Sequence, residues 1–289
     1  MSPPTSTNPI STALSPEFAA VRQGCLDFLE KQAESYDDWM VLQSGEKQTS
    51  STSSSSGAKP LNNRISAEKL EIARYVGKKY VGDDIIAVRG RLVFPETEPA
   101  EILGLIVDLE RRKLWDSQME YGRVHVQYEG AAGGDDGKDE QSTTVAHNDA
   151  VLNTRASTRT STQAAGCDLA HLAYKGALFV QPRDLCLLRA WHPTDFGCVL
   201  VAQSVADEAI PEKPGVVRAE LRECGYWLKA DGRGNTEATY ISSLDFKGNI
   251  PATFTNVILR QQPGTLLEMR NILRKRKGQP ELDAGCGVQ

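Results

Sequence analysis

Near the start of the chain, apolar residues recur at the spacing of an amphipathic helix. Ser15 suits the N-cap position and Pro16 the first helical position. About five helical turns with one apolar face are predicted by the residues that follow, namely Phe18, Val21, Cys25, Phe28 and Leu29. Residues 1–14 are rich in Ser, Thr and Pro, so we expect a disordered tail before this helix.

Most of the remaining chain carries the apolar runs and two-residue alternation of β-strands. The expected early strands are 39–42, 72–76, 85–94 and 124–128, with 143–152 as a further candidate. The expected later strands are 168–176, 184–192, 197–205, 215–228 and 236–246. Pro99 opens a helix whose apolar side carries Ile102, Leu105, Ile106 and Leu109, a short helical piece follows to Trp115, and a last helix covers 251–277. Long antiparallel strands flanked by helices predict an α+β fold.

Polar tracts interrupt this pattern and are expected to be loop insertions. They lie near 43–63, 130–142 and 153–166. Gly82-Asp83-Asp84 predicts a hairpin turn between two strands. With a flexible C-terminal tail at 278–289, the expected organisation is one domain over 15–277.

Composition narrows the class of protein. With 289 residues, 40% hydrophobic and 25% charged, the chain can bury one substantial core or at most two modest ones. A net charge of −5 argues against nucleic acid as a general partner, because nucleic acid requires a basic face. No segment has the apolar length of a membrane span, and the N-terminus lacks the basic and apolar regions of a secretory signal. The six cysteines show no disulfide-scaffold spacing, which predicts reduced thiols and a cytoplasmic protein.

Signatures of catalysis and of metal binding are absent from the sequence. We expect no metal or other cofactor. The four histidines form no i, i+4 pair and have no cysteine ligand near them in the sequence. They are His125, His147, His171 and His192. No G-x-S-x-G nucleophile motif is present, and Gly134–Lys138 lacks the strand-to-helix context of a phosphate loop. Asp184 and Asp245 lie at strand borders, where such residues usually cap or bridge the backbone. A non-enzymatic protein is therefore expected.

Four short strings, in order across roughly 140 residues, carry a family resemblance. They are LERRKLWD (109–116), PRDLCLLR (182–189), a segment from Val205 and Pro211 to GVVRA (215–219), and DFKGNIP (245–251). Together they resemble the START domain, the lipid-transfer module related to the steroidogenic acute regulatory protein. The departures are Leu185, where an aromatic residue is usual, the Ser-rich tract near residue 50 and the polar tract near residue 160.

The resemblance implies a helix-grip fold, in which a curved antiparallel sheet wraps around the long C-terminal helix and leaves an internal apolar tunnel. It also implies a monomer that binds one lipid, a sterol or a phospholipid, and shuttles it between membranes through transient contacts with their surfaces. Each methylene buried in such a tunnel contributes about 0.8 kcal/mol, so no catalytic group is required. Two alternatives remain: a helix-grip enzyme that acts on a lipid or thioester, and a lipid-gated interaction module.

One charged residue interrupts the apolar strand at 184–192. Both faces of this strand are apolar, so we expect it to be covered on both sides and Arg189 to be partly buried. A buried guanidinium needs an oxygen partner, because an unpaired one is costly. The resemblance implies that the partner is an acid on the preceding strand, for which Asp168 is the best candidate. The alternative is a surface arginine at a strand edge.

Further lipid contacts are expected along the same strand and on the last helix. The candidates are Leu187, Trp191, Tyr240, Phe254, Val257 and Ile258. The last three are spaced i, i+3, i+4, which places them on one side of the helix. Tyr240 has two interpretations, core packing or a tunnel hydroxyl that meets a lipid head group.

The end of the last helix is basic in a chain that is acidic as a whole. The residues are Arg270, Arg274, Lys275, Arg276 and Lys277. Cations favour a helix C-terminus and can simply be solvated there. The alternative is contact with anionic lipid, while Pro263-Gly264 kinks or locally breaks the helix and lets its first half act as a lid.

Overall fold

The structure is a computed structural model of the chain. It describes residues 10–33, 35, 37–43, 69–75, 85–129, 165–176, 180–248, 250 and 252–280, with the backbone alone for 10–12, 43, 85–86, 129 and 252–260. Several expectations lie outside the described residues. They are the tract at 44–63, the hairpin turn at 82–84, the tract at 130–142, the candidate strand at 143–152, the tract at 153–164 and the tail from 281.

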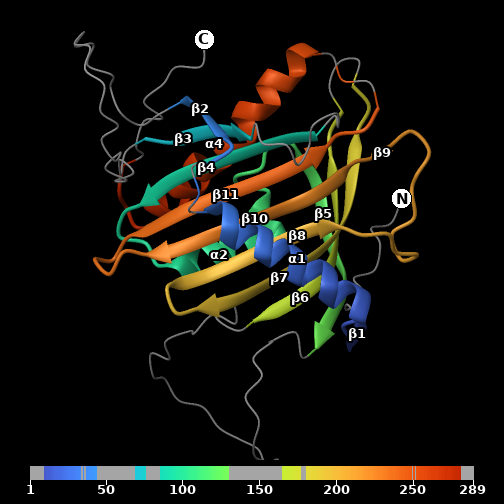
Figure 1. The fold of residues 1–289 in the computed structure, drawn as a ribbon, viewed down its shortest axis with the longest axis horizontal. Helices are drawn as coiled ribbons and strands as arrows, with labels where there is room; N and C mark the ends of the chain where they lie inside the picture. Colours follow the sequence, from blue (N-terminus) through green and yellow to red (C-terminus); the bar gives the residue numbers. More distant parts are fainter. Residues whose placement is uncertain are drawn as a thin grey trace, which may run out of the picture.

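One large sheet organises the described residues (Figure 1). Its strands are β1 (Ile10–Ala13), β2 (Trp39–Gln43), β3 (Glu71–Tyr75), β4 (Ile85–Phe94), β5 (Met119–Glu129), β6 (Gly166–Tyr174), β7 (Arg183–Thr194), β8 (Gly197–Ser204), β9 (Val217–Arg218), β10 (Glu220–Ala230) and β11 (Thr236–Asp245). The strand order is β1-β5-β6-β7-β8-β10-β11-β4-β3-β2, and β9 pairs with β7. All pairings are antiparallel except those of β1 with β5 and of β9 with β7. The predicted α+β class is therefore confirmed.

Two details of the strands differ from the sequence prediction. Ile10–Ala13, expected within a disordered tail, forms β1 and runs parallel to β5. The single strand predicted over 215–228 is split at Ala219. There the backbone N–H of Ala219 bonds to the carbonyl of Asp184 at 3.0 Å, and β9 pairs with β7 whereas β10 pairs with β8.

Helix α1 (Pro16–Ala33) lies across the face of the sheet that is nearer the viewer in Figure 1. The predicted N-cap is confirmed, since the backbone N–H of Phe18 donates to Ser15 Oγ at 3.2 Å. Cys25 and Leu29 of the helix are buried in an apolar cluster with β6, β7 and β8. We call this face of the sheet, toward α1, the outer face.

Two buried arginines of β4 hold the end of α1. Arg89 donates to the carbonyl of Gln32 at 3.3 Å, and Arg91 donates to the carbonyl of Ala33. The last carbonyls of a helix carry partial negative charge, so cations stabilise this end.

The other helices lie on the opposite face of the sheet, which we call the inner face. They are α2 (Pro99–Val107), α3 (Leu109–Arg112) and α4 (Ala252–Arg276). The predicted start of α2 is confirmed by a capping box between Glu98 and Glu101, with Pro99 in the first turn. Residues of α2 and α4 share an apolar cluster with β4, β8, β10 and β11.

Helix α4 continues through Pro263, so the predicted local break is wrong. A Cβ at Gly90 of β4 would lie 2.8 Å from Pro263 Cβ and 3.2 Å from Leu266. The helix therefore packs closely on β4 at a position that only glycine allows, and this contact supports it where proline removes a backbone hydrogen bond.

Candidate functional site

The inner face combines apolar side chains with a few buried polar ones. Leu187 lies in the apolar cluster beside α3, and Trp191 and Tyr240 lie in the cluster with α2 and α4. Because side chains alternate across a strand, residues of β7 with odd numbers share this face, and Arg189 lies between Leu187 and Trp191. The side chains of Phe254, Val257 and Ile258 lie outside the described residues.

The pairing predicted between Arg189 and Asp168 is confirmed. The two residues stand directly opposite each other in β7 and β6. Arg189 Nε donates to Asp168 Oδ1 at 2.8 Å and Nη2 donates to Oδ2 at 2.6 Å. Arg189 is 2% exposed and Asp168 is 1% exposed, so the interpretation as a surface arginine is wrong. Arg189 Nη1 also donates to the carbonyl of Val107 at the end of α2, at 3.2 Å.

A second polar cluster on this side was not predicted from the sequence as a site. Arg112 Nε donates to Asp116 Oδ2 at 3.2 Å, and its Nη2 donates to the Tyr174 hydroxyl at 3.2 Å. The Tyr174 hydroxyl donates to Asp116 Oδ2 at 3.3 Å. Burial lowers the pKa of Arg112, but Tyr174 and Asp116 raise it by more, so the net shift is upward. The only signal in the sequence was the LERRKLWD string, which includes both Arg112 and Asp116.

Two tyrosines of β10 and β11 lie near this cluster. The rings of Tyr226 and Tyr240 are 4.8 Å apart, and both hydroxyls interact electrostatically with Arg112. Burial raises the pKa of both tyrosines, which keeps them protonated as hydrogen-bond donors. Tyr240 thus packs in the core and also contributes a polar hydroxyl on the inner face.

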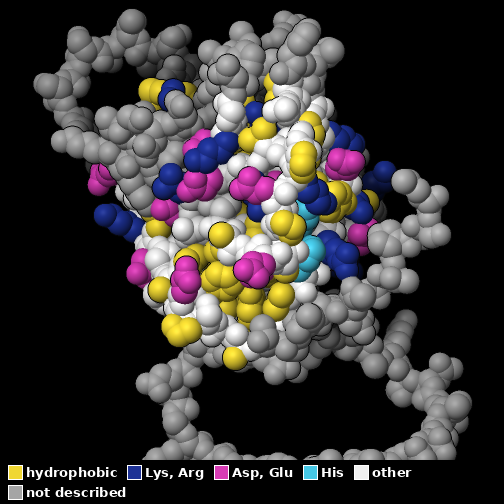
Figure 2. All heavy atoms as spheres, turned by 90° about the vertical axis from the view of Figure 1, so that its right-hand side faces the viewer, with side chains coloured by type: hydrophobic (Ala, Val, Ile, Leu, Met, Phe, Trp, Pro, Cys, Tyr) yellow, Lys and Arg dark blue, Asp and Glu magenta, His cyan; other side chains and the backbone are white. Residues whose placement is uncertain are grey.

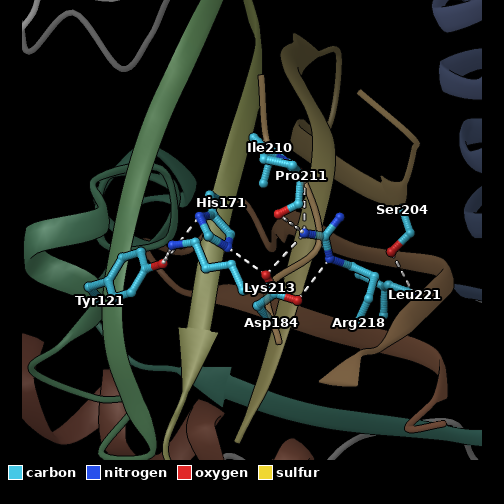
Figure 3. A network of polar contacts seen from close by, with 9 residues as sticks. All are labelled: Tyr121, His171, Asp184, Ser204, Ile210, Pro211, Lys213, Arg218 and Leu221. Carbon is cyan, nitrogen blue, oxygen red and sulfur yellow. Dashed lines mark hydrogen bonds and ion pairs between the residues drawn. The ribbon is translucent and has the colours of Figure 1, made fainter. Parts of the chain in front are cut away.

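On the outer face, Asp184 organises a separate network (Figure 3). Arg218 of β9 donates to Asp184 through Nε at 2.8 Å and Nη2 at 3.0 Å. His171 Nε2 lies 2.8 Å from Asp184 Oδ2, and His171 Nδ1 lies 3.3 Å from the Tyr121 hydroxyl, which Lys213 approaches at 3.5 Å. Asp184 is therefore the centre of an ion-pair network, whereas its position at a strand border suggested a backbone cap.

Asp245 does bridge the backbone as expected, since its Oδ1 accepts the N–H of Lys247 at 2.8 Å.

Burial and charge set the protonation of this network in opposite directions. Burial raises the pKa of Asp184, but Arg218 and His171 lower it by more, so the carboxylate stays ionised. Burial lowers the pKa of His171 and outweighs the opposing effect of Asp184, so the ring is neutral near pH 7. The side that carries β5 and β9 in Figure 1 faces the viewer in Figure 2, where histidine side chains lie beside basic and hydrophobic ones.

The basic end of α4 is only partly on the surface. Arg270 is 1% exposed, so the prediction that it contacts membrane is wrong for this conformation. Arg274 Nε donates to the carbonyl of Pro280 at 2.8 Å, and Lys277 pairs with Glu101 at 2.9 Å. Lys275 and Arg276 are exposed.

The described residues contain no group of three or more His, Cys, Asp or Glu side chains that could hold a metal ion. Within the same residues, no helix combines the length and hydrophobicity needed to cross a membrane.

Comparison with known proteins decides the family. The family model named START domain matches residues 27–276, which is most of the chain. The chain belongs to the START domain family. Three of the START-like strings noted in the sequence meet in space, because Asp184 of PRD binds Arg218 of GVVRA and Arg183 of PRD binds the carbonyls of Phe246 and Lys247 in DFKG.

Curated relatives and solved structures agree with this assignment. The chain is 34% identical to the steroidogenic acute regulatory protein of Bos taurus over 110 residues, which is 37% of this chain and 38% of that protein. It is 35% identical to the same protein of Oncorhynchus mykiss over 99 residues, 34% of this chain and 33% of that one. The matched region thus spans less than two fifths of these relatives.

Two human structures share the fold. Human StAR-related lipid transfer protein 5 superposes with a TM-score of 0.61 and 13% identity, covering 91% of this chain and 100% of that chain. Human STARD10 superposes with a TM-score of 0.57 and 16% identity, covering 92% of this chain and 83% of that chain. The predicted START-like fold, an antiparallel sheet with a long C-terminal helix, is therefore confirmed, and the internal tunnel between them stays a prediction.

Proposed function

We propose that this START domain binds one lipid molecule, a sterol or a phospholipid, between the inner face of its sheet and α4, and transfers it between membranes. The observation that carries the proposal is the ion pair of Asp168 and Arg189, which is buried on the largely apolar inner face between Leu187 and Trp191. Replacing a buried ion pair by apolar side chains is often neutral or stabilising, so the stability of the fold does not require this pair. Binding of a polar group of the ligand would explain why a charged pair is present here.

The chemistry of the pair suits a hydroxyl or a carbonyl of the ligand. Asp168 neutralises Arg189, and the contacts to Asp168 and Val107 use three of the five guanidinium N–H groups. The remaining N–H groups can donate to a ligand oxygen, and the carboxylate can accept from a ligand hydroxyl. Leu187 and Trp191 on either side supply apolar contact, worth about 25 cal/mol per Å² of buried apolar surface.

Arg112, with Asp116 and Tyr174, provides a second polar contact for the ligand. It lies on α3, directly after the helix whose last carbonyl receives Arg189. Its pKa is raised, so it remains a cation and can meet an anionic or strongly polar head group. The tyrosine pair of Tyr226 and Tyr240 adds hydroxyl donors beside it. A ligand with an apolar body and a polar end could hydrogen-bond to the Asp168–Arg189 pair and to the Arg112 cluster while its body packs on the apolar residues.

The proposed function needs no catalytic step. The described His171–Asp184 pair has the partners of an acid–base dyad, but it lies on the outer face and both ring nitrogens already have contacts. The name of one similar human structure, StAR-related lipid transfer protein 5, also points to lipid transfer rather than to catalysis. We propose a cytoplasmic monomer that associates with membranes peripherally.

Native mass spectrometry of protein purified from its own source tests this function. The expected spectrum contains a species heavier than the chain by the mass of one lipid. A protein that carries no lipid and shows no saturable binding to a panel of fluorescent sterols and phospholipids would contradict the proposal.

The basic end of α4 is proposed to hold the protein against anionic membrane. The exposed Lys275 and Arg276 are available for this contact, whereas Arg274 and Lys277 would first have to leave Pro280 and Glu101. A basic residue near an anionic surface contributes about 1 kcal/mol.

Replacing Lys275 and Arg276 with Gln is therefore expected to weaken binding to anionic vesicles by about 2 kcal/mol. Co-sedimentation with vesicles measures this, with lipid affinity in solution expected to stay the same. Replacing Arg222 and Arg233, exposed on and after β10, is the matched control. Equal binding of the unmodified protein to anionic and neutral vesicles would overturn the proposal.

A further inference from the structure

Strand β5 gathers nitrogen donors on the outer face, away from the proposed lipid site. Its pairing with β6 shifts register between Val124 and Val126, so that His125 falls in a β-bulge. Bulges re-aim the side chains around them and are frequent beside functional sites. Arg123 lies opposite His171 of β6, and the ring of His125 lies 6.0 Å from that of His171. One guanidinium and two imidazoles therefore meet at this position.

Lys213 joins these side chains from the loop between β8 and β9. Its Nζ lies 3.5 Å from the Tyr121 hydroxyl and 6.0 Å from the centre of the Tyr121 ring. The same hydroxyl lies 3.3 Å from His171 Nδ1 (Figure 3). We call Tyr121, Arg123, His125, His171 and Lys213 the donor cluster. Two neighbouring strands and one loop, distant in the sequence, contribute to it.

The Asp184 network holds the loop that carries Lys213. Arg218, which Asp184 binds at 2.8 Å, also donates to the carbonyl of Ile210 at 3.1 Å and to that of Pro211 at 3.3 Å. Both carbonyls belong to the loop, so its path beside β5 is set by an ion pair of the sheet. A site whose side chains are positioned in advance loses less conformational entropy when it binds a ligand.

The charge within the donor cluster is mainly positive. Burial lowers the pKa of His125 most. Arg123, His171 and Lys213 lower it further, and Asp207 opposes them. The three groups therefore lie close enough to act on the ring, and together they outweigh the one acid that raises its pKa.

The donor cluster is open to solvent. Arg123 and Lys213 are exposed, and Tyr121 and His125 are partly buried. Figure 2 shows this side of the molecule, where histidine side chains reach the surface beside Lys and Arg. A ligand can therefore approach two exposed cations and the more deeply placed hydroxyl and imidazole between them.

We propose that the donor cluster binds a phosphate group, at a site on the opposite face of the sheet from the proposed lipid site and independent of it. A phosphate monoester has three terminal oxygens and carries about two negative charges, so donors of different kinds can contact it together. Lys213 and Arg123 supply the positive charge, and the Tyr121 hydroxyl and the His125 ring donate hydrogen bonds. The phosphate belongs either to a soluble molecule or to the head group of a phospholipid.

Nuclear magnetic resonance of the histidine rings tests the site near pH 7. Titration with inorganic phosphate is expected to shift the ring signals of His125 and His171 saturably. The signal of His192, near the far end of β7, is the internal reference and is expected not to shift. Lys213→Gln is expected to weaken binding about tenfold, because a hydrogen bond to a charged group is lost, and Tyr121→Phe about threefold.

The matched control is Lys175→Gln. It removes the same charge from an exposed lysine whose Nζ donates to the carbonyl of Ser117 at 3.4 Å. It is expected to change phosphate affinity by less than about twofold, because salt screens charges that do not contact the ligand. Equal weakening in Lys213→Gln and Lys175→Gln would show a general attraction to positive charge and overturn the site.

Co-sedimentation with vesicles distinguishes the two sources of the phosphate. Vesicles that contain phosphatidic acid, whose phosphate is terminal, are compared with phosphatidylserine vesicles of equal surface charge. Stronger binding to phosphatidic acid that is lost in Lys213→Gln and kept in Lys175→Gln would assign the site to a lipid head group. Saturable shifts with inorganic phosphate, together with equal binding to both vesicles, would assign it to a soluble molecule. If inorganic phosphate shifts neither histidine signal and no vesicle preference depends on Lys213, the proposal is wrong.

Discussion

Replacing Arg189 with methionine is expected to lower the free energy of unfolding by about 3–5 kcal/mol. Methionine fills a similar volume, so the loss does not come from a cavity. It comes from Asp168, which is 1% exposed and would keep a buried negative charge without its two short bonds to Arg189. Any lipid still bound is expected to lose selectivity for its polar end, because the guanidinium proposed to recognise that end would be gone.

Urea denaturation of four proteins measures this effect. The set is the unmodified protein, Arg189→Met, Asp168→Asn and the double variant, and we expect the two single losses to be strongly non-additive because the residues form one pair. The matched control is Arg222→Met, whose pair with Glu220 at 2.6 Å lies on the surface, with side chains 44% and 36% exposed. A surface pair is worth about 0–1 kcal/mol. An Arg189→Met protein as stable and as selective as the parent would show that the pair has no role.

Replacing Asp184 with asparagine is expected to cost about 3–5 kcal/mol. The carboxylate binds Arg218 and His171 and is 2% exposed. An asparagine of the same size cannot neutralise Arg218, whose hydrogen-bond acceptors at this site, among them the carbonyls of Ile210 and Pro211, would then all be uncharged. The control is Glu110→Gln, which breaks the pair with Lys113 at 3.1 Å on the surface and is expected to cost under about 1 kcal/mol.

The pH dependence of stability distinguishes the two groups of this network. The pKa of Asp184 is lowered on folding, so its contribution is present above the unfolded pKa of about 3.9 and is lost as the pH falls through the lower folded pKa. The pKa of His171 is also lowered, so the unfolded chain takes up the proton first and stability declines as the pH falls below about 6.5. Asp184→Asn is expected to abolish the decline near pH 4 and below, which denaturation between pH 3 and pH 8 measures. If the free energy of unfolding of the variant fell with pH as steeply as that of the parent, the acid-induced loss of stability would come from other carboxylates.

The sequence predicted those features that depend on local patterns. The start of α1 followed from Ser15 and Pro16, because Ser is favoured at the N-cap and Pro at the first helical position. The Asp168–Arg189 pair followed from alternation along β7, together with the family resemblance that supplied an acid on the preceding strand. Both predictions concern residues of the same element or of adjacent elements.

Features that depend on distant segments were missed. Arg270 looks like a surface cation in the sequence, but the inner-face cluster buries it. The strand at 215–228 is split because β9 pairs with β7 whereas β10 pairs with β8, and this pairing brings Arg218 to Asp184, more than thirty residues away. Arg112 and Tyr174 meet across 62 residues, and Arg183 reaches Phe246 across 63. Hydrophobic periodicity in a short stretch of sequence cannot predict such contacts, because they depend on which strands become neighbours in the sheet.

Cross-linking with a photoreactive sterol and a photoreactive phospholipid tests the central claim most directly. Digestion and mass spectrometry then locate the label. The account predicts that at least one of the two probes labels the chain saturably, with one label per chain, on peptides that carry the inner-face residues Leu187, Trp191 and Tyr240, and that unlabelled lipid competes. Labelling confined to α1 and the outer face, or labelling by both probes that never saturates, would contradict a lipid site between the inner face and α4.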